Sequence, residues 1–250
     1  MEEAQLSDLG ALGLDWDRPI LRQSEQMEVY EEAIARLDAE GLLDPCYCTR
    51  AEIRAAASAP HGISTSDHYP GTCRELTVAQ RAVHEASGRP PALRVRSGGV
   101  RVAVEDRLLG RYENEVDDDF VVRRNDGTPA YQLAVVVDDA AQGIGEVVRG
   151  ADLADSTPRQ ILLARMLGLP ALRYAHVPLV LGPDGRRLAK RHGAVTLSEG
   201  AALGEGPEQA RAWMARSLGL ARVGETPSPG DLIAHFDPQR LPRDPTVWSP

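Results

Sequence analysis

The chain has 250 residues, a mass of 27.0 kDa and a formal net charge of −9, with 42% hydrophobic and 26% charged residues. These values are ordinary for a globular protein of one large or two small domains, and the acidic balance argues against a protein that coats nucleic acid. No apolar run approaches the roughly 20 residues that cross a bilayer, and the acidic N-terminus has no signal-peptide pattern, so we expect a cytoplasmic protein with no membrane partner.

The first predicted element is helical and covers residues 5–44. Apolar side chains recur there at helical spacing: Met27, Tyr30, Ile34 and Leu37. Ser24 is the predicted N-cap of this run, and Gly41 is its predicted end. Thr49 is then predicted to cap a second helix that extends through Ala57.

All three cysteines fall between positions 46 and 73. An odd, clustered set of cysteines in a reducing compartment favours a metal site over a disulfide. Cys46 and Cys48, with Cys73 further along the chain, offer three soft ligands for Zn²⁺ from two adjacent loops. Tetrahedral zinc needs a fourth ligand, and the nearby candidates are His61, His68 and Tyr69. Ligand statistics favour a histidine, and the alternative is a set of free or buried thiols.

The next elements are a short helix over residues 77–88 and extended segments over residues 90–116. Apolar and basic residues alternate in two parts of the extended region, residues 92–96 and 100–104. The basic members of this pattern would share one strand face or its neighbour: Arg94, Arg96 and Arg101. Such a face is either an RNA-facing surface or an ordinary solvated sheet face.

The most regular pattern lies between residues 120 and 181 and predicts an α/β fold. Strands are predicted at residues 120–124, 131–137, 146–150 and 176–181. Ser156 begins a segment that caps a helix ending at Pro170, with Pro158 in its first turn. Continuous valine runs joined by crossovers indicate a buried parallel sheet.

A basic loop, residues 186–196, follows the last predicted strand. Its cationic side chains are Arg186, Arg187, Lys190, Arg191 and, when protonated, His192. Ligands of open α/β sheets bind at the carboxyl ends of strands, so this loop is placed to bind a nucleotide phosphate; the alternative is a solvated basic loop. Two helices are predicted beyond it, at residues 207–218 and 229–235, and then a loosely held proline-rich tail over residues 241–250.

Three sequence blocks together resemble the glutamyl/glutaminyl class of class I aminoacyl-tRNA synthetases. They are residues 131–139 with 148–152, then residues 156–160, and then residues 188–193, which resemble the family's "KMSKS" loop. The Cys46-x-Cys48 pair, residues 69–74 and a chain that ends soon after the loop resemble the family's short paralogues, which lack the anticodon-binding domain.

The resemblance implies a class I synthetase Rossmann-type parallel sheet. The first strand and the "HIGH" segment of that sheet are missing from residues 1–250. The resemblance also implies an inserted zinc-bearing domain, similar to an acceptor-binding domain, and a small helical C-terminal part. The expected boundaries are 1–45 and 117–183 for the two parts of the nucleotide-binding fold, 46–116 for the inserted domain, and 184–250 for the loop and the helical part.

The resemblance also implies an activity, which is the ligation of glutamate to tRNA. Glutamate would be activated with ATP and Mg²⁺ and then transferred to the queuosine base in the anticodon of tRNA(Asp), by a protein that acts as a monomer. Tyr131 and Arg149 would bind glutamate. Lys190 would contact the ATP phosphates as the catalytic residue, with Arg187 and Arg191 as supporting ATP-binding charges, and Asp152 would lie near the nucleotide.

The family's metal pattern, Cys-x-Cys followed by Tyr-x-x-x-Cys, implies one structural zinc ion. Its ligands in this chain would be Cys46, Cys48, Tyr69 and Cys73, so that the tyrosine replaces a histidine as the fourth ligand.

The chain departs from the family pattern in two places. In the loop, Arg187 stands for the first lysine and Ala189 for the serine; in addition, no His-x-Gly-His motif occurs. The resemblance therefore implies a further N-terminal segment, and we expect little glutamate activation by residues 1–250 alone. Three hypotheses stay open: an enzyme completed by such a segment, a catalytically impaired paralogue that binds tRNA or zinc, and a zinc-stabilised nucleotide-binding protein.

Overall fold

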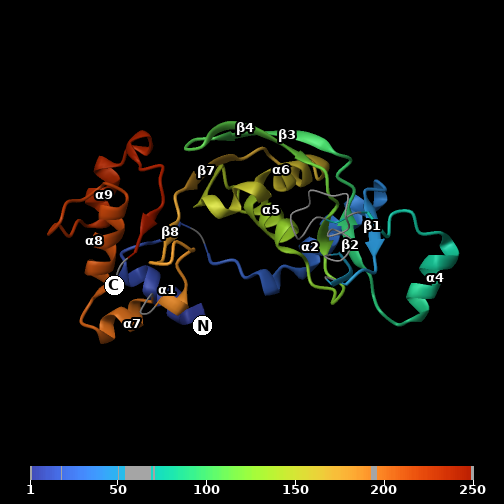
Figure 1. The fold of residues 1–250 in the computed structure, drawn as a ribbon, viewed down its shortest axis with the longest axis horizontal. Helices are drawn as coiled ribbons and strands as arrows, with labels where there is room; N and C mark the ends of the chain where they lie inside the picture. Colours follow the sequence, from blue (N-terminus) through green and yellow to red (C-terminus); the bar gives the residue numbers. More distant parts are fainter. Residues whose placement is uncertain are drawn as a thin grey trace. The chain divides into compact units, whose positions relative to one another are not determined.

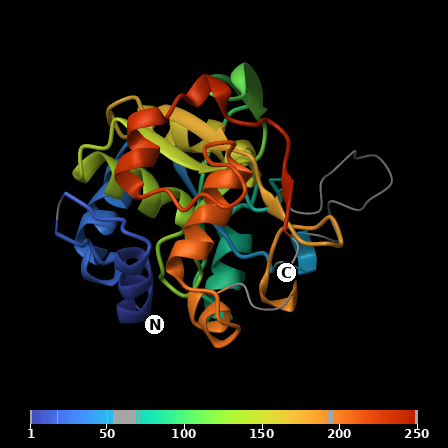
Figure 2. The ribbon, with the colours of Figure 1, turned by 90° about the vertical axis from the view of Figure 1, so that its left-hand side faces the viewer.

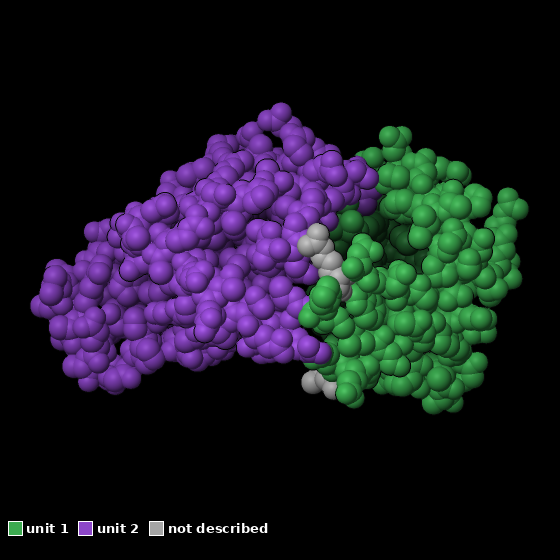
Figure 3. All heavy atoms as spheres, turned by 180° about the vertical axis from the view of Figure 1, so that it is seen from behind, with its two compact units in different colours: residues 1–20, 148–152, 175–250 green, residues 21–147, 153–174 purple. Residues whose placement is uncertain are grey.

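The computed structural model describes residues 2–17, 19–49, 51–53, 69, 71–192 and 196–248, and of Lys190 only the backbone. The chain forms two compact units (Figure 3). Unit 1 comprises Met1–Ile20, Val148–Asp152 and Ala175–Pro250; unit 2 comprises Leu21–Val147 and Leu153–Tyr174. None of the helices in the described ranges is long and apolar enough to cross a membrane.

Unit 2 contains most of the regular structure (Figure 1). Its helices are η1 (Gln23–Glu25), α2 (Met27–Ala39), α4 (Val78–Ala86), α5 (Tyr131–Ala141) and α6 (Thr157–Met166). Its strands are β1 (Leu43–Cys46), β2 (Ala92–Val95), β3 (Val100–Asp106), β4 (Gly110–Val116) and β5 (Phe120–Arg123). Three elements have residues in both units: β6 (Glu146–Gly150), η2 (Ala151–Ser156) and β7 (Arg173–Val177).

Two sheets organise these strands. The first has the order β1-β2-β5 and is antiparallel, with Leu43 opposite Val95. The second has the order β4-β3-β7-β6; its strands β3 and β4 form an antiparallel hairpin (Figure 1), whereas β3 pairs with β7 in parallel. The predicted α/β class with parallel pairing is therefore confirmed, although antiparallel pairs are also present.

The core of unit 2 lies among α2, α5, α6, the first sheet and the hairpin of β3 and β4. Several side chains in it are fully buried: Leu37, Val95, Val122, Leu133 and Leu163. The helical spacing predicted for α2 is confirmed for Tyr30, Ile34 and Leu37, which are buried, whereas Met27 of the same pattern is exposed.

The valine run at residues 131–137 is a helix, α5, so the predicted strand is wrong. Its buried residues are spaced as one face of a helix: Leu133, Ala134, Val136, Val137 and Asp138. A short apolar run with β-branched residues does not distinguish a buried strand from a buried helix, and packing here overrides the strand propensity of valine. Asp138 is tolerated in this face because it accepts hydrogen bonds from the Tyr30 hydroxyl (2.7 Å) and the Gln23 amide (2.8 Å).

The prediction for residues 5–44 is correct only in part. The structure has two separate helices there, α1 (Glu2–Ala11) and α2, with η1 between them, and β1 begins at Leu43. Ser24 lies within η1, and Gln26 is the N-cap residue of α2. Gly41 ends the helical segment as predicted, with a φ of 67° that favours glycine.

Unit 1 contains the C-terminal part of the chain. Its elements beyond α1 are β8 (Val180–Leu181), η3 (Lys190–His192), α7 (Leu197–Ala202), α8 (Pro207–Ser217), α9 (Pro229–His235), η4 (Pro238–Arg240) and β9 (Thr246–Val247). The strand predicted at 176–181 is therefore two strands, β7 and β8, which are interrupted at Pro178.

The described part of the proline-rich tail, residues 241–248, is not loosely held, which corrects the prediction for that part of the segment. Leu241 is buried, and β9 pairs with β8 in parallel (Figure 2). The Thr246 and Trp248 amides donate to the carbonyls of Leu179 (3.0 Å) and Leu181 (2.7 Å). The prediction was based on the proline-rich composition, but the tail is ordered by pairing with β8, which lies far away in the sequence.

Most of the remaining elements agree with the predictions. The short helix at 77–88 is α4, which Thr77 caps through a reciprocal bond with Gln80. Thr49 caps the segment that follows it, since the Glu52 amide donates to its hydroxyl (3.0 Å); residues 51–53 are helical, and the rest of that predicted helix lies outside the described residues.

Candidate functional site

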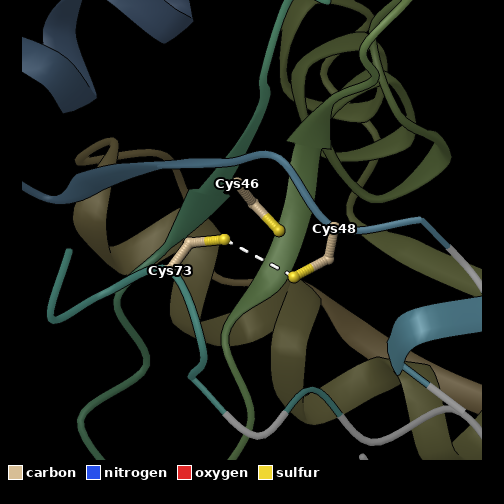
Figure 4. Close-up of side chains that lie close together, drawn as sticks. All are labelled: Cys46, Cys48 and Cys73. Carbon is tan, nitrogen blue, oxygen red and sulfur yellow. Dashed lines mark hydrogen bonds between the residues drawn. The ribbon is translucent and has the colours of Figure 1, made fainter. Parts of the chain in front are cut away.

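The three cysteines form one cluster in unit 2. Cys46 ends β1, Cys48 follows two residues later, and Cys73 lies in a turn that precedes α4. Their sulfur atoms all lie within 4.8 Å of one another, and the Sγ atoms of Cys48 and Cys73 are 3.4 Å apart. The side chains point toward a common centre (Figure 4). Cys46 and Cys73 are buried and Cys48 is half-buried.

Tyr69 lies in the same buried cluster as the cysteines. The side chain is 4% exposed, and its hydroxyl accepts a hydrogen bond from the Cys73 amide (2.8 Å). Burial raises the pKa of Tyr69 above its ordinary value. His61 and His68, the other candidates for a fourth ligand, lie outside the described residues.

A buried cation lies beside the thiols. The Arg94 guanidinium stacks 3.9 Å from the centroid of the Tyr69 ring and donates to the Asp119 carbonyl (2.7 Å). Its Nε is buried without a hydrogen-bond partner. Burial acts to raise the pKa of the Cys46 thiol, but the charge of Arg94 and its hydrogen bond to this thiol hold the pKa below the ordinary value.

The neighbouring Cys48 shows the opposite behaviour. Burial, a hydrogen bond to Cys73 and the charge of Cys46 raise the pKa of the Cys48 thiol to about 12. Several thiols at such short range do not ionise together without a cation among them.

The geometry of the cluster fits a zinc ion. Zinc–sulfur bonds of about 2.3 Å in a tetrahedron place ligand sulfurs about 3.8 Å apart, which is close to the spacing in this cluster. The donor set has the softness that zinc prefers, and Arg94 offsets the negative charge that three thiolates carry beyond that of the metal. Cys46, Cys48 and Cys73 are thus able to hold zinc, with the Tyr69 oxygen as the nearby fourth donor.

The basic residues of β2 and β3 do not form one surface. Arg94 is buried beneath the cluster; Arg96 binds Asp44 through both oxygens (2.6 and 2.7 Å), and Arg101 lies 3.7 Å from Glu113. The expectation of a common RNA-facing side is therefore wrong for Arg94. Strand alternation predicts on which face of a strand a residue lies, but it does not predict that the Arg94 guanidinium is buried beside the thiols.

The cationic loop after β8 is a hairpin followed by a turn. The Leu188 amide donates to the Val180 carbonyl (2.9 Å), and Arg187 bridges to Leu181 in antiparallel fashion. Arg187 donates to the carboxylate of Asp152, which places the two residues together. The Lys190 backbone lies in η3, and its side chain lies outside the described atoms.

Arg149 and Tyr131, the predicted glutamate-binding residues, lie in different units. Tyr131 is the first residue of α5 and is 51% exposed. Arg149 lies in β6, and its Nε donates to Nε2 of His176 in β7 (3.1 Å). His176 is 1% exposed and did not stand out in the sequence, because a histidine at a buried strand position is ordinarily a packing residue.

Sequence reasoning also missed an acidic anchor below the thiol cluster. Asp119 is 1% exposed and accepts hydrogen bonds from both Nε (3.1 Å) and Nη2 of Arg74, the residue after Cys73. The available signal was the acidic triplet at residues 117–119, which nothing in the sequence marks as buried.

Comparison with known proteins assigns the family. The family described as tRNA synthetases class I (E and Q), catalytic domain, matches residues 1–231. The chain therefore belongs to this family of ligases. It is 55% identical to a glutamyl-Q tRNA(Asp) synthetase of Nocardia farcinica, over 98% of this chain and 77% of that protein.

One further relative has the same name, and one solved structure has a similar fold. A glutamyl-Q tRNA(Asp) synthetase of Symbiobacterium thermophilum is 50% identical over 98% of this chain and 79% of that protein. A crystal structure of a glutamate tRNA ligase from Elizabethkingia meningosepticum matches with a TM-score of 0.75 at 21% identity. The match covers 99% of this chain and 57% of the ligase chain. This structural likeness supports the class I synthetase fold.

Proposed function

We propose that this protein activates glutamate with ATP and transfers it to the queuosine base of the tRNA(Asp) anticodon. The observation that carries the proposal is the 55% identity, over almost the whole chain, to a protein named glutamyl-Q tRNA(Asp) synthetase. A relative named glutamate–tRNA ligase, from Geobacter sulfurreducens, is 40% identical and shares only 53% of its own length with this chain. The short paralogue is therefore the better match, and its substrates place it in the cytoplasm.

Glutamate binding is assigned to Tyr131 and Arg149. A guanidinium recognises a carboxylate through a planar pair of N–H donors, and the Arg149 guanidinium is positioned by the bond from its Nε to Nε2 of His176. Tyr131 offers an exposed hydroxyl at the start of α5.

The ATP phosphates are assigned to the basic loop. Lys190 is the catalytic residue, with Arg187 and Arg191 beside it, and Mg²⁺ accompanies ATP as part of the substrate. The glutamate carboxylate attacks the α-phosphorus in line and pyrophosphate leaves, so that the site acts by positioning the reactants and by offsetting charge. In the structure Arg187 is paired with Asp152, a carboxylate that a phosphate would replace.

One structural zinc ion is assigned to Cys46, Cys48, Cys73 and Tyr69. When bound, the metal supplies folding free energy to the segment that joins β1 to α4, because its ligands come from both ends of that segment. Arg94 and Asp119 would keep these ligands in place.

The test is glutamate-dependent exchange of pyrophosphate into ATP. It is run with residues 1–250 and with the protein extended by any coding sequence in frame before Met1. Exchange that requires glutamate and is not supported by glutamine supports the proposal. Binding of zinc and tRNA without exchange by either form would contradict it and favour a binding paralogue.

A further inference from the structure

We propose that His192 is a positioning residue. It fixes the turn at residues 189–192 of the basic loop (the second turn) onto the turn before it, residues 182–186 (the first turn), by packing its ring against Gly182. The inference rests on the proposed function only in that the ligand of the loop is taken to be the ATP phosphates. It concerns residues 182–192, all of which lie in unit 1.

The first turn of the loop is closed by the backbone. The Gly182 amide donates to the Arg186 carbonyl (2.7 Å), and the Gly185 amide donates back to Gly182 (3.0 Å), with Gly185 at a φ of 71°. The Asp184 carboxylate accepts from the Arg186 amide (2.9 Å), which lowers the pKa of Asp184 and keeps its charge at this turn.

The second turn is closed by His192. Its amide donates to the Ala189 carbonyl (2.8 Å), while its ring Nδ1 accepts from the Ala189 amide (3.0 Å). Lys190 and Arg191 are the two central residues of this turn. An imidazole nitrogen that accepts a backbone N–H carries no proton itself, so Nδ1 acts here as the acceptor that closes the turn.

His192 also joins the two turns. Its side chain is only 8% exposed, and Nε2 lies 3.1 Å from Asp184 Oδ1, although the two atoms are not aligned as a hydrogen bond. The ring packs against Gly182, where an added Cβ would lie 2.6 Å from Nδ1 and Cε1. His192, which was expected to add positive charge to the loop, is thus a buried contact that holds the backbone of the second turn.

Gly182 gives a way to displace the ring without changing any polar group. Its backbone is outside the positive-φ region, so an alanine there is not strained by its own conformation. The Cβ of Gly182→Ala would meet the His192 ring at a distance that real contacts do not tolerate, and the ring would have to move. The matched control is Gly10→Ala in α1 of the same unit, where an added Cβ meets nothing within 4 Å.

The experiment compares Gly182→Ala, His192→Ala and the double variant. Hydrogen exchange of peptides covering residues 180–192 is measured together with KM for ATP and KM for glutamate. We expect faster exchange in both single variants and a KM for ATP raised roughly tenfold, the size of losing one buried hydrogen bond and its packing, with KM for glutamate unchanged. In the double variant Gly182→Ala should add nothing, because the ring that it displaces is gone.

A conservative variant separates positioning from general destabilisation. In His192→Asn the amide oxygen takes the place of Nδ1 and accepts from Ala189, so exchange and KM should return most of the way to wild type. Wild-type values in either single variant, or additive effects in the double variant, would overturn the proposal. Hydrogen exchange tests the role of His192 even if neither the wild type nor any variant catalyses pyrophosphate exchange. Absence of pyrophosphate exchange would count against the proposed function and not against the role of His192.

Discussion

The thiol cluster and the basic loop both concentrate reactive side chains, but the side chains of the cluster are mostly buried and those of the loop are exposed. Cys46, Tyr69 and Cys73 are 2%, 4% and 3% exposed, and a buried guanidinium lies against them. In the loop, the Arg187 and Arg191 side chains are 72% and 53% exposed and contact carboxylates that water also reaches.

This difference separates a structural site from a ligand site. A buried set of donors gains its ligand as part of folding, because the groups are too costly to leave unpaired. Exposed ion pairs contribute about 0–1 kcal/mol each, so a phosphate is able to displace their carboxylates at little cost. The cluster should therefore respond to substitution with loss of structure, and the loop with loss of ligand binding.

The largest effect on structure is expected from Cys73→Ser. It removes a sulfur that lies 3.4 Å from Cys48, and bound zinc should fall from one ion per chain to less than about a tenth of that. Metal analysis of the purified protein measures this, with Thr72→Ser at the adjacent exposed position as the control. Unchanged zinc in Cys73→Ser would rule out the assigned ligand set.

The largest effect on catalysis is expected in the loop. Lys190→Ala should lower kcat/KM for pyrophosphate exchange by about 100- to 1000-fold, as for other groups that offset charge in a transition state, while zinc content and unfolding stay as in wild type. Arg186→Ala is the control, because it removes a neighbouring charge with no assigned role, and it should change kcat/KM by no more than about twofold. Equal effects of the two substitutions would mean that the loop acts only through its net charge.

Arg94 tests the comparison from the other side, because it is a cation that lies buried beside the thiol cluster rather than exposed in the loop. Arg94→Met keeps much of the side-chain volume and should weaken zinc binding about 10- to 100-fold, the range for groups that support metal ligands. Competition with a chromophoric chelator measures this affinity. Arg96→Met, two residues further along the chain and paired with Asp44, should leave the affinity unchanged; a similar loss there would contradict a specific role for Arg94.

The smallest effect concerns the tail that pairs with β8. Thr246→Pro removes the N–H that donates to Leu179 and should lower the free energy of unfolding by about 1 kcal/mol, measured by denaturant titration. Val247→Pro is the matched control, because the bonds of β9 to β8 use the amides on either side of Val247. If both prolines cost the same, the pairing of β9 contributes nothing measurable.

Local patterns were sufficient to predict much of this fold. The helix α4 and the strands β2 to β6 follow from capping residues and alternation, and the spacing of the cysteines predicted their cluster. Two errors are at α5 and at β9, where a valine run and a proline-rich tail take the structure that their distant neighbours impose. Two others are divisions, since residues 5–44 form separate helices and residues 176–181 belong to two strands.

The candidate site was predictable in its residue types but not in its supporting contacts. Cys46, Cys48 and Cys73 come together as their spacing predicts, whereas the burial of Arg94 and His192 depends on which neighbours the fold provides. A basic residue on an alternating strand and a histidine in a cationic loop carry no local mark of burial. Such contacts follow from packing, which the sequence does not display residue by residue.

The most direct measurement is the transfer of labelled glutamate to tRNA(Asp) prepared with and without queuosine, each with and without its 3′-terminal adenosine. The account predicts incorporation that requires queuosine and does not require the terminal adenosine. Incorporation that requires the adenosine and ignores queuosine would contradict it, and would make the protein an ordinary tRNA-charging enzyme.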